Sequence, residues 1–368
     1  MRMRIMAVAV IVILLCMVVA CQVPESTSTE PKSTESESPE PKSTESQSSS
    51  DRASLENYID QYLDAMMAND PSKDLFTKDC KFTENGVQLP LGGEGLWYSM
   101  SGRGTYKFYI PDVETRQISF IGTVREGGGL PQAMAGESAP GAEASEGTLA
   151  AVAIRLKIDD NGKISEAEQL VIRPEISLFA GQNEEEETPS RFPPTGEAVE
   201  NMVAPHKVFT EVIPENERTS REELVRIADY YFEGLQRNDG KGYYPFTDDC
   251  DRYENGMKTT NIPMPDPVTG ESMTMGCKEQ FEKSLKGVVT RIRDRRFVAV
   301  DRERGIVFAF GFFDHLQINW TWQIAELFKI ENGLMRRIEA VFLRCPYGMN
   351  SGWSTYEQGL SEEIQSVQ

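Results

Sequence analysis

Residues 76–86 read FTKDCKFTENG, and residues 246–256 read FTDDCDRYENG. The shared pattern F-T-x-D-C-x-x-x-E-N-G returns after 170 positions. A second pair of segments, GKISEAEQLVIR at 162–173 and GLMRRIEAVFLR at 333–344, lies 171 positions apart. Two anchors that agree within one residue are not a chance match. A long repeat with only two copies predicts tandem domains rather than a solenoid.

Each copy begins with an amphipathic helix. Residues 54–68 and residues 222–236 each place a row of apolar side chains on one helical face. These are Leu55, Tyr58, Ile59, Tyr62 and Met66 in the first copy, and Leu224, Ile227, Tyr231 and Leu235 in the second. Ser220 and Glu223 form a capping box that marks the start of the second helix.

Each copy ends in strands, which are clearest in the second. Strands are predicted at 295–300, 305–315, 320–330 and 334–344, separated by turn signals at 301–305, around Asn319 and at 331–333. The middle of each copy is irregular, and its Asn-Gly pair favours a tight turn. Helix, irregular middle and antiparallel meander make each copy α+β.

This order resembles the nuclear-transport-factor-2-like superfamily, in its SnoaL-like branch. The resemblance rests on the ending G-x-x-R-R-I-E-x-V-F at 333–342 and on residues 292–315, IRDRRFVAVDRERGIVFAFGFFDH, which resemble an uncharacterised subgroup. It covers residues 220–346 well and 54–174 weakly. It implies two tandem cone-shaped domains, each a curved antiparallel sheet wrapped on a long N-terminal helix around a pocket. The superfamily includes isomerases, cyclases, dehydratases, ligand binders and dimerisation modules, so the fold leaves the function open.

The domain boundaries follow from composition. We expect a degenerate SnoaL-like domain at 51–180, a linker at 181–218 with five prolines and the Glu184–Glu187 run, a second SnoaL-like domain at 219–348, and a tail at 349–368. Residues 126–147, rich in Gly, Ala and Glu, predict a flexible loop. The first copy has no counterpart of Asp314-His315, so we expect it to be a structural or partner domain.

The N-terminus predicts export. Arg2 and Arg4 precede an apolar run of about 15 residues, shorter than the ~20 of a spanning helix. Residues 18–21, VVAC, resemble the lipobox of bacterial lipoproteins. That resemblance implies a signal peptide at 1–20 and a Cys21 that carries diacylglycerol and an acyl chain. An uncleaved membrane anchor is the alternative.

Residues 21–50 predict a disordered spacer. They are nearly all Ser, Thr, Glu, Pro and Lys, with PKSTES occurring twice, and such a segment buries too little apolar surface to fold. We therefore expect an exported protein, lipid-anchored at the extracytoplasmic face of the cell membrane. The outer membrane remains open for a double-membraned host.

Charge and cysteine content narrow the partners. The net charge of −20 argues against binding to nucleic acid or docking on anionic lipid. The four cysteines beyond Cys21 allow three pairings, and export permits disulfides. A metal site is less favoured, because there is no C-x-x-C pair and only His206 and His315 could supply imidazole. We expect no metal and no cofactor.

The best disulfide pair is Cys250 with Cys277. The two flank the irregular middle of the second domain, and the resembling subgroup carries both. Cys80 and Cys345 are either bridged between the domains or free thiols.

Asp314 and His315 are the most obvious catalytic candidates, since His315 or Asp314 could act as a general base. Adjacent strand residues point to opposite faces, so only one of them can face a pocket. The alternative is a strand-end pair that makes local hydrogen bonds.

Glu326 is a second candidate. It shares a strand face with Trp322 and other apolar residues, where its pKa could be raised for acid–base work. The favoured alternative is an ion pair with Arg337 or Arg295. Glu254 is a minor pocket candidate.

The remaining candidates are Trp322, which with its aromatic neighbours is core or pocket wall, and the arginines at 293, 295 and 296. The arginines could bind an anion, or form a strand face paired with nearby acids.

These expectations converge on a tethered module that binds a small apolar ligand or a protein partner. One alternative is a cofactor-free isomerase or lyase that uses the pocket of the second domain. The other is a structural pair of domains that forms a homodimer through its sheets.

Overall fold

The computed structural model describes residues 44–72, 74–127, 147–174, 193–237, 239–265, 272–283, 285 and 287–366. The predicted signal peptide, Cys21 and most of the predicted spacer lie outside these residues, as does most of the predicted loop at 126–147. The described residues pack as one unit. Of the helices in the described segments, none has the length and apolar character required to cross a bilayer.

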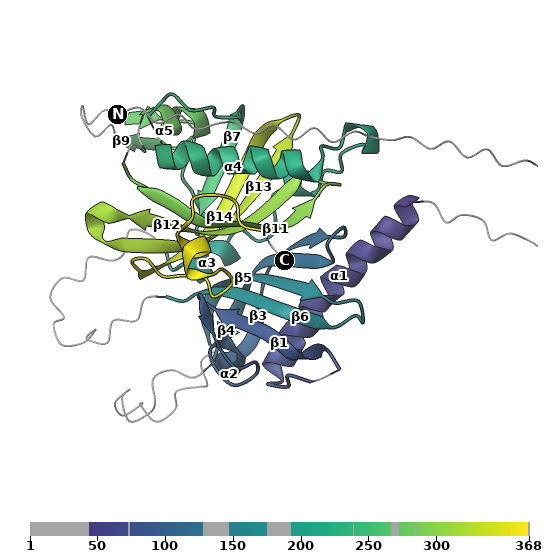
Figure 1. Ribbon diagram of the computed structural model, residues 1–368. Coiled ribbons are helices and arrows are strands. Elements are labelled where there is room, and N and C mark those ends of the chain that lie inside the picture. The colour runs from purple at the N-terminus through teal and green to yellow at the C-terminus, as the bar shows by residue number, and fades with distance from the viewer. Residues whose placement is uncertain are drawn as a thin grey trace, which may run out of the picture. The chain divides into compact units, whose positions relative to one another are not determined.

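The first copy consists of one long helix and a six-stranded sheet (Figure 1). Helix α1 (Thr44–Met67) is followed by β1 (Phe76–Glu84), β2 (Val87–Gln88) and the short helix α2 (Leu96–Ser99). The meander β3 (Met100–Asp112), β4 (Gln117–Glu126), β5 (Thr148–Ile158) and β6 (Ile164–Ile172) completes it. The strand order is β2-β1-β6-β5-β4-β3.

The second copy repeats this plan. It contains α4 (Arg221–Arg237), β7 (Phe246–Glu254), β8 (Met257–Lys258), the pair β9 (Pro263–Pro265) and β10 (Ser272–Thr274), and α5 (Cys277–Lys283). Its meander is β11 (Arg291–Asp301), β12 (Ile306–His315), β13 (Trp320–Glu331) and β14 (Leu334–Pro346). The strand order β11-β12-β13-β14-β7-β8 is that of the first sheet read from its other end. The prediction of tandem α+β domains is confirmed.

The expectation of purely antiparallel sheets is wrong at one place in each sheet. β1 runs parallel to β6, and β7 runs parallel to β14. These strands are the repeated F-T-x-D-C segments, which the sequence placed in an irregular middle. Each precedes its meander and joins the last meander strand without a hairpin, so its direction is not set by a tight turn.

The repeated E-N-G motif is a structural joint. Asn255 has a φ of 50°. Its side-chain amide donates to the carbonyl of Phe342 at 3.2 Å, and its side-chain oxygen accepts from the amide of the same residue at 2.8 Å. Asn85 makes the same pair of bonds with Val171 at 3.2 and 2.8 Å. In each copy the asparagine thus fastens the turn to the last strand of the meander.

The helices cover the inner faces of the sheets. Figure 1 shows α4 lying across its sheet, and the core between them is rich in aromatic rings. Tyr231 lies with its ring centroid 5.1 Å from Phe281 and 5.2 Å from Phe328. Rings therefore fill much of the space beneath α4.

The outer faces of the two sheets form a third apolar core. It joins residues of the first sheet, such as Phe108 and Leu170, to residues of the second, such as Phe310 and Leu327. Helix α3 (Thr195–Glu200) and the 3₁₀ turn η1 (Lys207–Thr210) add to it, and the Phe209 ring lies 4.9 Å from that of Phe108. The described part of the predicted linker is therefore packed into the protein rather than a simple spacer.

The segments that flank the two copies have structure of their own. α1 begins at Thr44, seven residues before the predicted domain start, because a helix anchored by its apolar face extends at low cost into a polar flank. The C-terminal tail, with α6 (Tyr356–Leu360), lies along the edge strand β11. The amide of Asp294 donates to the carbonyl of Ser361 at 3.0 Å, and that of Gln365 to the carbonyl of Arg295 at 2.8 Å. The tail thereby covers an edge that would otherwise expose unpaired backbone groups.

Candidate functional site

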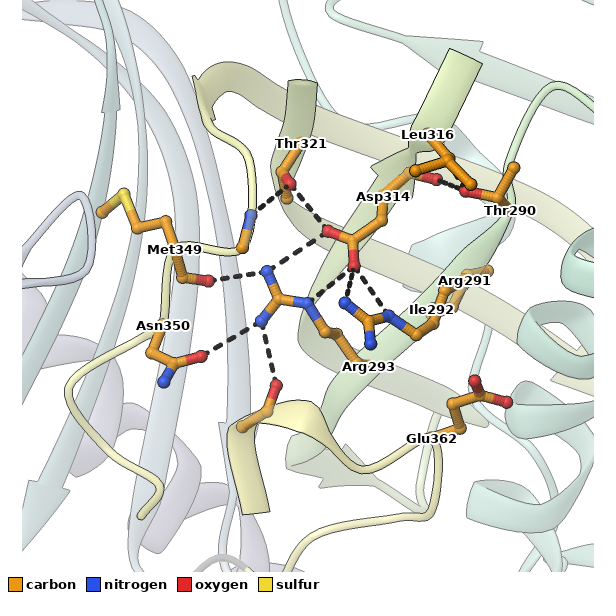
Figure 2. A network of polar contacts seen from close by, with 12 residues as sticks. Thr290, Arg291, Ile292, Arg293, Asp314, Leu316, Thr321, Met349, Asn350 and Glu362 are labelled. Atoms are coloured by element: carbon orange, nitrogen blue, oxygen red, sulfur yellow. Dashed lines mark hydrogen bonds and ion pairs between the residues drawn. The ribbon is translucent and has the colours of Figure 1, made fainter. Parts of the chain in front are cut away.

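Asp314, near the end of β12, lies at the centre of a polar network (Figure 2). Its carboxylate has no exposed surface and accepts from Arg293 Nε at 2.9 Å, Arg291 Nη2 at 2.6 Å and Thr321 Oγ1 at 2.7 Å. Burial raises the pKa of Asp314, but the hydrogen bonds from these donors outweigh it and hold that pKa below its usual value. The carboxylate is thus ionised and occupied by its partners.

Arg293 extends this network to the C-terminal tail. Figure 2 shows its guanidinium between Asp314 and the tail, where it donates to the carbonyls of Met349 at 2.8 Å and Gly359 at 2.9 Å. The side chain is fully buried. The network therefore fastens the tail to the sheet, which agrees with the local-hydrogen-bond interpretation of Asp314.

His315 lies on the opposite face of β12 from Asp314. Its Nδ1 is 2.5 Å from the carbonyl oxygen of Val288, and its ring centroid is 4.2 Å from that of Trp322. Burial lowers its pKa, so the ring is neutral at pH 7. Its Nε2 has no hydrogen-bond partner among the described residues. Asp314 and His315 are therefore adjacent in sequence, but their side chains lie on opposite faces of the sheet and do not form one site.

Glu326 is a buried carboxyl on the inner face of β13. Its cross-strand neighbours are Ala309 and Ala340. Burial raises its pKa to about 8, although a hydrogen bond from the Tyr231 hydroxyl acts in the opposite direction. Its Oε2 has no partner among the described residues. The pKa of this carboxyl is therefore well above that of a solvated glutamate.

The ion pair expected for Glu326 is not the one observed. Arg337 pairs with Glu339 at 2.5 Å, and Arg295 pairs with Asp229 at 3.1 Å. The charged side chains that act on the pKa of Glu326 are instead Arg252 and Glu254. Both lie on β7, where they form an ion pair with each other at 3.0 Å. Strand spacing identified the face of Glu326 but not the helix residue that lies opposite.

The first copy has a closed version of this cluster. Glu84, the counterpart of Glu254, accepts at 2.8 Å from Leu96 N, Gln169 Nε2 and Arg173 Nη2. Gln169 and Ala340 are equivalent residues of the two copies. The cross-strand neighbour of Ala340 is Glu326, whereas that of Gln169 is Ile154. The first copy therefore has an apolar side chain in the position of Glu326. Both oxygens of the Glu84 carboxylate are therefore paired.

Access to Glu326 is blocked by packing. Glu326 and Tyr231 are both nearly inaccessible to solvent. Neither they nor Arg252 line any of four cavities found among the described residues. The aromatic rings beneath α4 occupy that space, so a substrate could not reach this carboxyl in the described conformation.

The largest of these four cavities has a volume of about 840 Å³ and lies at the ends of β6 and β14. We call it the aromatic cavity. Equivalent residues of both copies line it, together with Trp320 and Trp322. The equivalent pairs are Asn85 and Asn255, Val171 and Phe342, Ile172 and Leu343, and Arg173 and Arg344. Its volume falls within the roughly 300–1,000 Å³ of small-molecule sites.

The wall from the second copy is aromatic. The rings of Trp322 and Phe342 are stacked, with centroids 4.7 Å apart and planes 28° from parallel. The guanidinium of Arg344 lies 4.1 Å above the Trp320 ring. Trp320, Trp322 and Phe342 are all only partly buried, so part of each ring remains exposed at the cavity.

The two arginines of the aromatic cavity differ in whether a described carboxylate pairs with them. Arg173 pairs with Glu84 and with Glu126, each at 2.8 Å. Arg344 is exposed, and among the described residues its guanidinium contacts only the Trp320 ring. Sequence reasoning missed both, although each ends one of the repeated segments, 162–173 and 333–344.

Cys250 and Cys277 form a disulfide with Cα atoms 5.9 Å apart. Cys80 and Cys345 are free thiols, so a bridge between them is absent. Within the described segments, no three His, Cys, Asp or Glu side chains gather as metal ligands would.

The comparisons with known proteins identify a family. A family model described as "Domain of unknown function (DUF8021)" matches residues 48–171 and 217–342, more than half of the chain. The chain belongs to this family. The family is present twice, once in each copy of the repeat, which agrees with the tandem architecture.

No curated protein matches the chain. Among solved structures, it is similar to a de novo designed protein with a curved β-sheet, at 16% identity and a TM-score of 0.22, over 33% of this chain and 87% of that one. It is also similar to AclR from Streptomyces galilaeus, a candidate hydroxylase, at 14% identity and a TM-score of 0.24, over 33% of this chain and 79% of that one.

Proposed function

We propose that this chain is a ligand-binding protein, tethered outside the cytoplasm by a lipid on Cys21, and that the aromatic cavity is its binding site. The observation that carries the proposal is the stacked pair Trp322 and Phe342 at the wall of a cavity of about 840 Å³. Large rings left partly exposed in a concave surface offer apolar area to a ligand, and a ligand that covers them gains the free energy of burial.

The position of the cavity supports the proposal. Its lining includes four pairs of equivalent residues, so the site needs both copies of the repeat. Tandem domains would then serve to build one site, with the second copy supplying the aromatic rings. The spacer predicted after Cys21 would hold this site away from the bilayer.

A cofactor-free isomerase or lyase is the second candidate. It is favoured by one observation, the raised pKa and unpaired Oε2 of Glu326. It requires an opening beneath α4 that would admit a substrate to this carboxyl. The aromatic cavity requires no such movement, so binding is the better-supported function.

The binding proposal is tested by titrating the full chain with N-phenyl-1-naphthylamine, a neutral apolar probe whose fluorescence rises in apolar surroundings. We expect saturable binding at one site. Trp322→Ala should weaken it by about tenfold, which corresponds to about 1.4 kcal/mol of lost stacking and burial. Trp353→Ala, which removes a partly buried tryptophan outside the cavity, is the matched control.

The proposal fails if the probe does not saturate, or if the two tryptophan variants weaken binding equally. Thermal unfolding of each variant, followed by far-ultraviolet circular dichroism, separates a loss of binding from a loss of fold.

A further inference from the structure

We infer that the ligand of the aromatic cavity is an apolar anion with a single negative charge, and that Arg344 binds its charged group. This inference rests on the proposed function, because it assigns the ligand class of the same site.

The side chains that line the aromatic cavity include cations. Among the described residues that line the aromatic cavity, two have cationic side chains, Arg173 and Arg344, and none is acidic. Arg173 is neutralised by two carboxylates at 2.8 Å, one on β1 and one on β4. Arg344 has no carboxylate within ion-pair distance among the described residues, so the described part of the lining retains about one uncompensated positive charge.

Most cationic side chains of the second sheet already have a carboxylate partner. The chain has 58 acidic and 38 basic residues, so acidic partners are in excess. Of the lysines and arginines in the second sheet, Arg291, Arg293, Arg295, Arg296, Lys329, Arg336 and Arg337 each pair with a carboxylate. A cation left unpaired beside a cavity is available to an anion from outside.

The last feature is the orientation of Arg344. The Arg344 guanidinium lies over the face of the Trp320 ring, 4.1 Å from the ring centroid. This arrangement leaves the N–H groups at the edge of the guanidinium free for an acceptor. A carboxylate or sulfonate matches that edge with two parallel hydrogen bonds. Arg344 is also the direct cross-strand neighbour of Trp322. Opposite strand residues have Cβ atoms about 5 Å apart, so the charge and the stacked rings belong to the same wall of the cavity.

These three features together define the ligand. Its apolar body, aromatic or fused-ring, covers Trp322 and Phe342, and its one acidic group reaches Arg344. A volume of about 840 Å³ admits a body of two or three fused rings. An acidic protein segment is a different class of partner, which small probes would not mimic.

The test uses two probes with the same apolar body. 1-Anilinonaphthalene-8-sulfonate is N-phenyl-1-naphthylamine with one added sulfonate, so the pair isolates the charge. For the full chain we expect the anionic probe to bind about tenfold more tightly than the neutral one, and its binding to weaken as salt is raised.

Arg344→Gln should remove the preference, weakening the anionic probe about tenfold and changing the neutral probe less than twofold. The matched control is Arg237→Gln, which makes the same change of charge at an exposed position at the end of α4. Both sites are on the surface, so neither variant is expected to unfold the chain.

Each outcome is decisive. Equal affinity for the two probes, or equal effects of the Arg344 and Arg237 variants, overturns the assignment of an anion while leaving the cavity as an apolar site. Failure of both probes to bind overturns the proposed function and this inference with it. Binding of an acidic peptide but of neither probe would contradict the small-molecule class.

Discussion

Arg52 of α1 and Arg221 of α4 are equivalent residues, 169 positions apart, and each pairs with the other copy of the repeat. Arg52 donates to Asp301 at 2.6 Å, and Arg221 donates to Asp112 at 2.9 Å. The two aspartates are themselves equivalent, since each is the last residue of the first meander strand. Such a reciprocal exchange is the pattern of a twofold-symmetric dimer interface, here contained within one chain.

This exchange bears on the predicted homodimer. The outer sheet faces, which a dimer formed through the sheets would use, already pack against each other in the third apolar core. A homodimer of the whole chain would have to use another surface.

The first prediction concerns this exchange. Arg221→Ala leaves Asp112 buried with no cation beside it, and we expect the free energy of unfolding to fall by about 3 kcal/mol. Arg226→Ala, on the same helix, breaks exposed contacts with Glu223 and Tyr230 and should cost less than about 0.5 kcal/mol. Urea unfolding measures both, and equal costs would show that the interface does not depend on the exchange.

The second prediction concerns the pH dependence of stability. Because the pKa of Glu326 rises to about 8 on folding, the folded state holds this proton more tightly than the unfolded state. Its contribution to stability is therefore complete below the usual carboxyl pKa, near 4.5, and is lost as the pH rises toward about 8. The loss from this group is about 1.4 kcal/mol per pH unit within that window.

Glu326→Gln should remove this slope. The free energy of unfolding of the variant should therefore rise steadily relative to that of the wild type between pH 5 and pH 8. Glu357→Gln, at an exposed position of α6, serves as the control and should follow the wild-type curve. Urea unfolding at several pH values checks the prediction. A Glu326→Gln curve parallel to the wild type would mean that the carboxyl is ionised in the fold.

The third prediction separates structure from catalysis at Asp314. Asp314→Asn removes the charge that compensates buried Arg293, and should lower the free energy of unfolding by about 3 kcal/mol. Asp249→Asn, at an exposed position on β7, should cost less than about 0.5 kcal/mol. Unchanged stability in Asp314→Asn would contradict the role of this network in holding the tail.

The fourth prediction concerns the tether. Cys21→Ala should move the chain from the membrane fraction to the soluble fraction of the producing cells, because a lipid can no longer be attached. Cys16→Ala, five residues earlier in the apolar run, should leave the chain in the membrane. Incorporation of a labelled fatty acid is the second readout. A Cys21→Ala chain that stays in the membrane would indicate the uncleaved anchor.

Much of the fold could be predicted because its signals are periodic. The apolar rows at 3.6-residue spacing placed α1 and α4, and alternation placed β11 to β14 within a few residues. β1 and β7 were missed because Lys78, Asp79 and their counterparts resemble a polar loop, whereas in the structure they are the exposed positions of a strand.

The candidate site was less accessible to sequence reasoning. Trp322 and Glu326 were correctly placed on one strand face, but the partner of Glu326 lies on α4 and cannot be read from strand spacing. The role proposed for Arg344 depends on two features that the sequence does not show. These are its contact with Trp320 and the absence of a nearby carboxylate among the described residues. A site shared by two copies depends on how their sheets pack, and no local pattern encodes that.

The most direct test of the proposed binding site is a crystal structure of the chain grown with 1-anilinonaphthalene-8-sulfonate. We predict density for the naphthalene ring against Trp322 and Phe342, with the sulfonate within hydrogen-bonding distance of Arg344. Density for the probe beneath α4 beside Glu326, with the aromatic cavity empty, would contradict the account and favour the second candidate function.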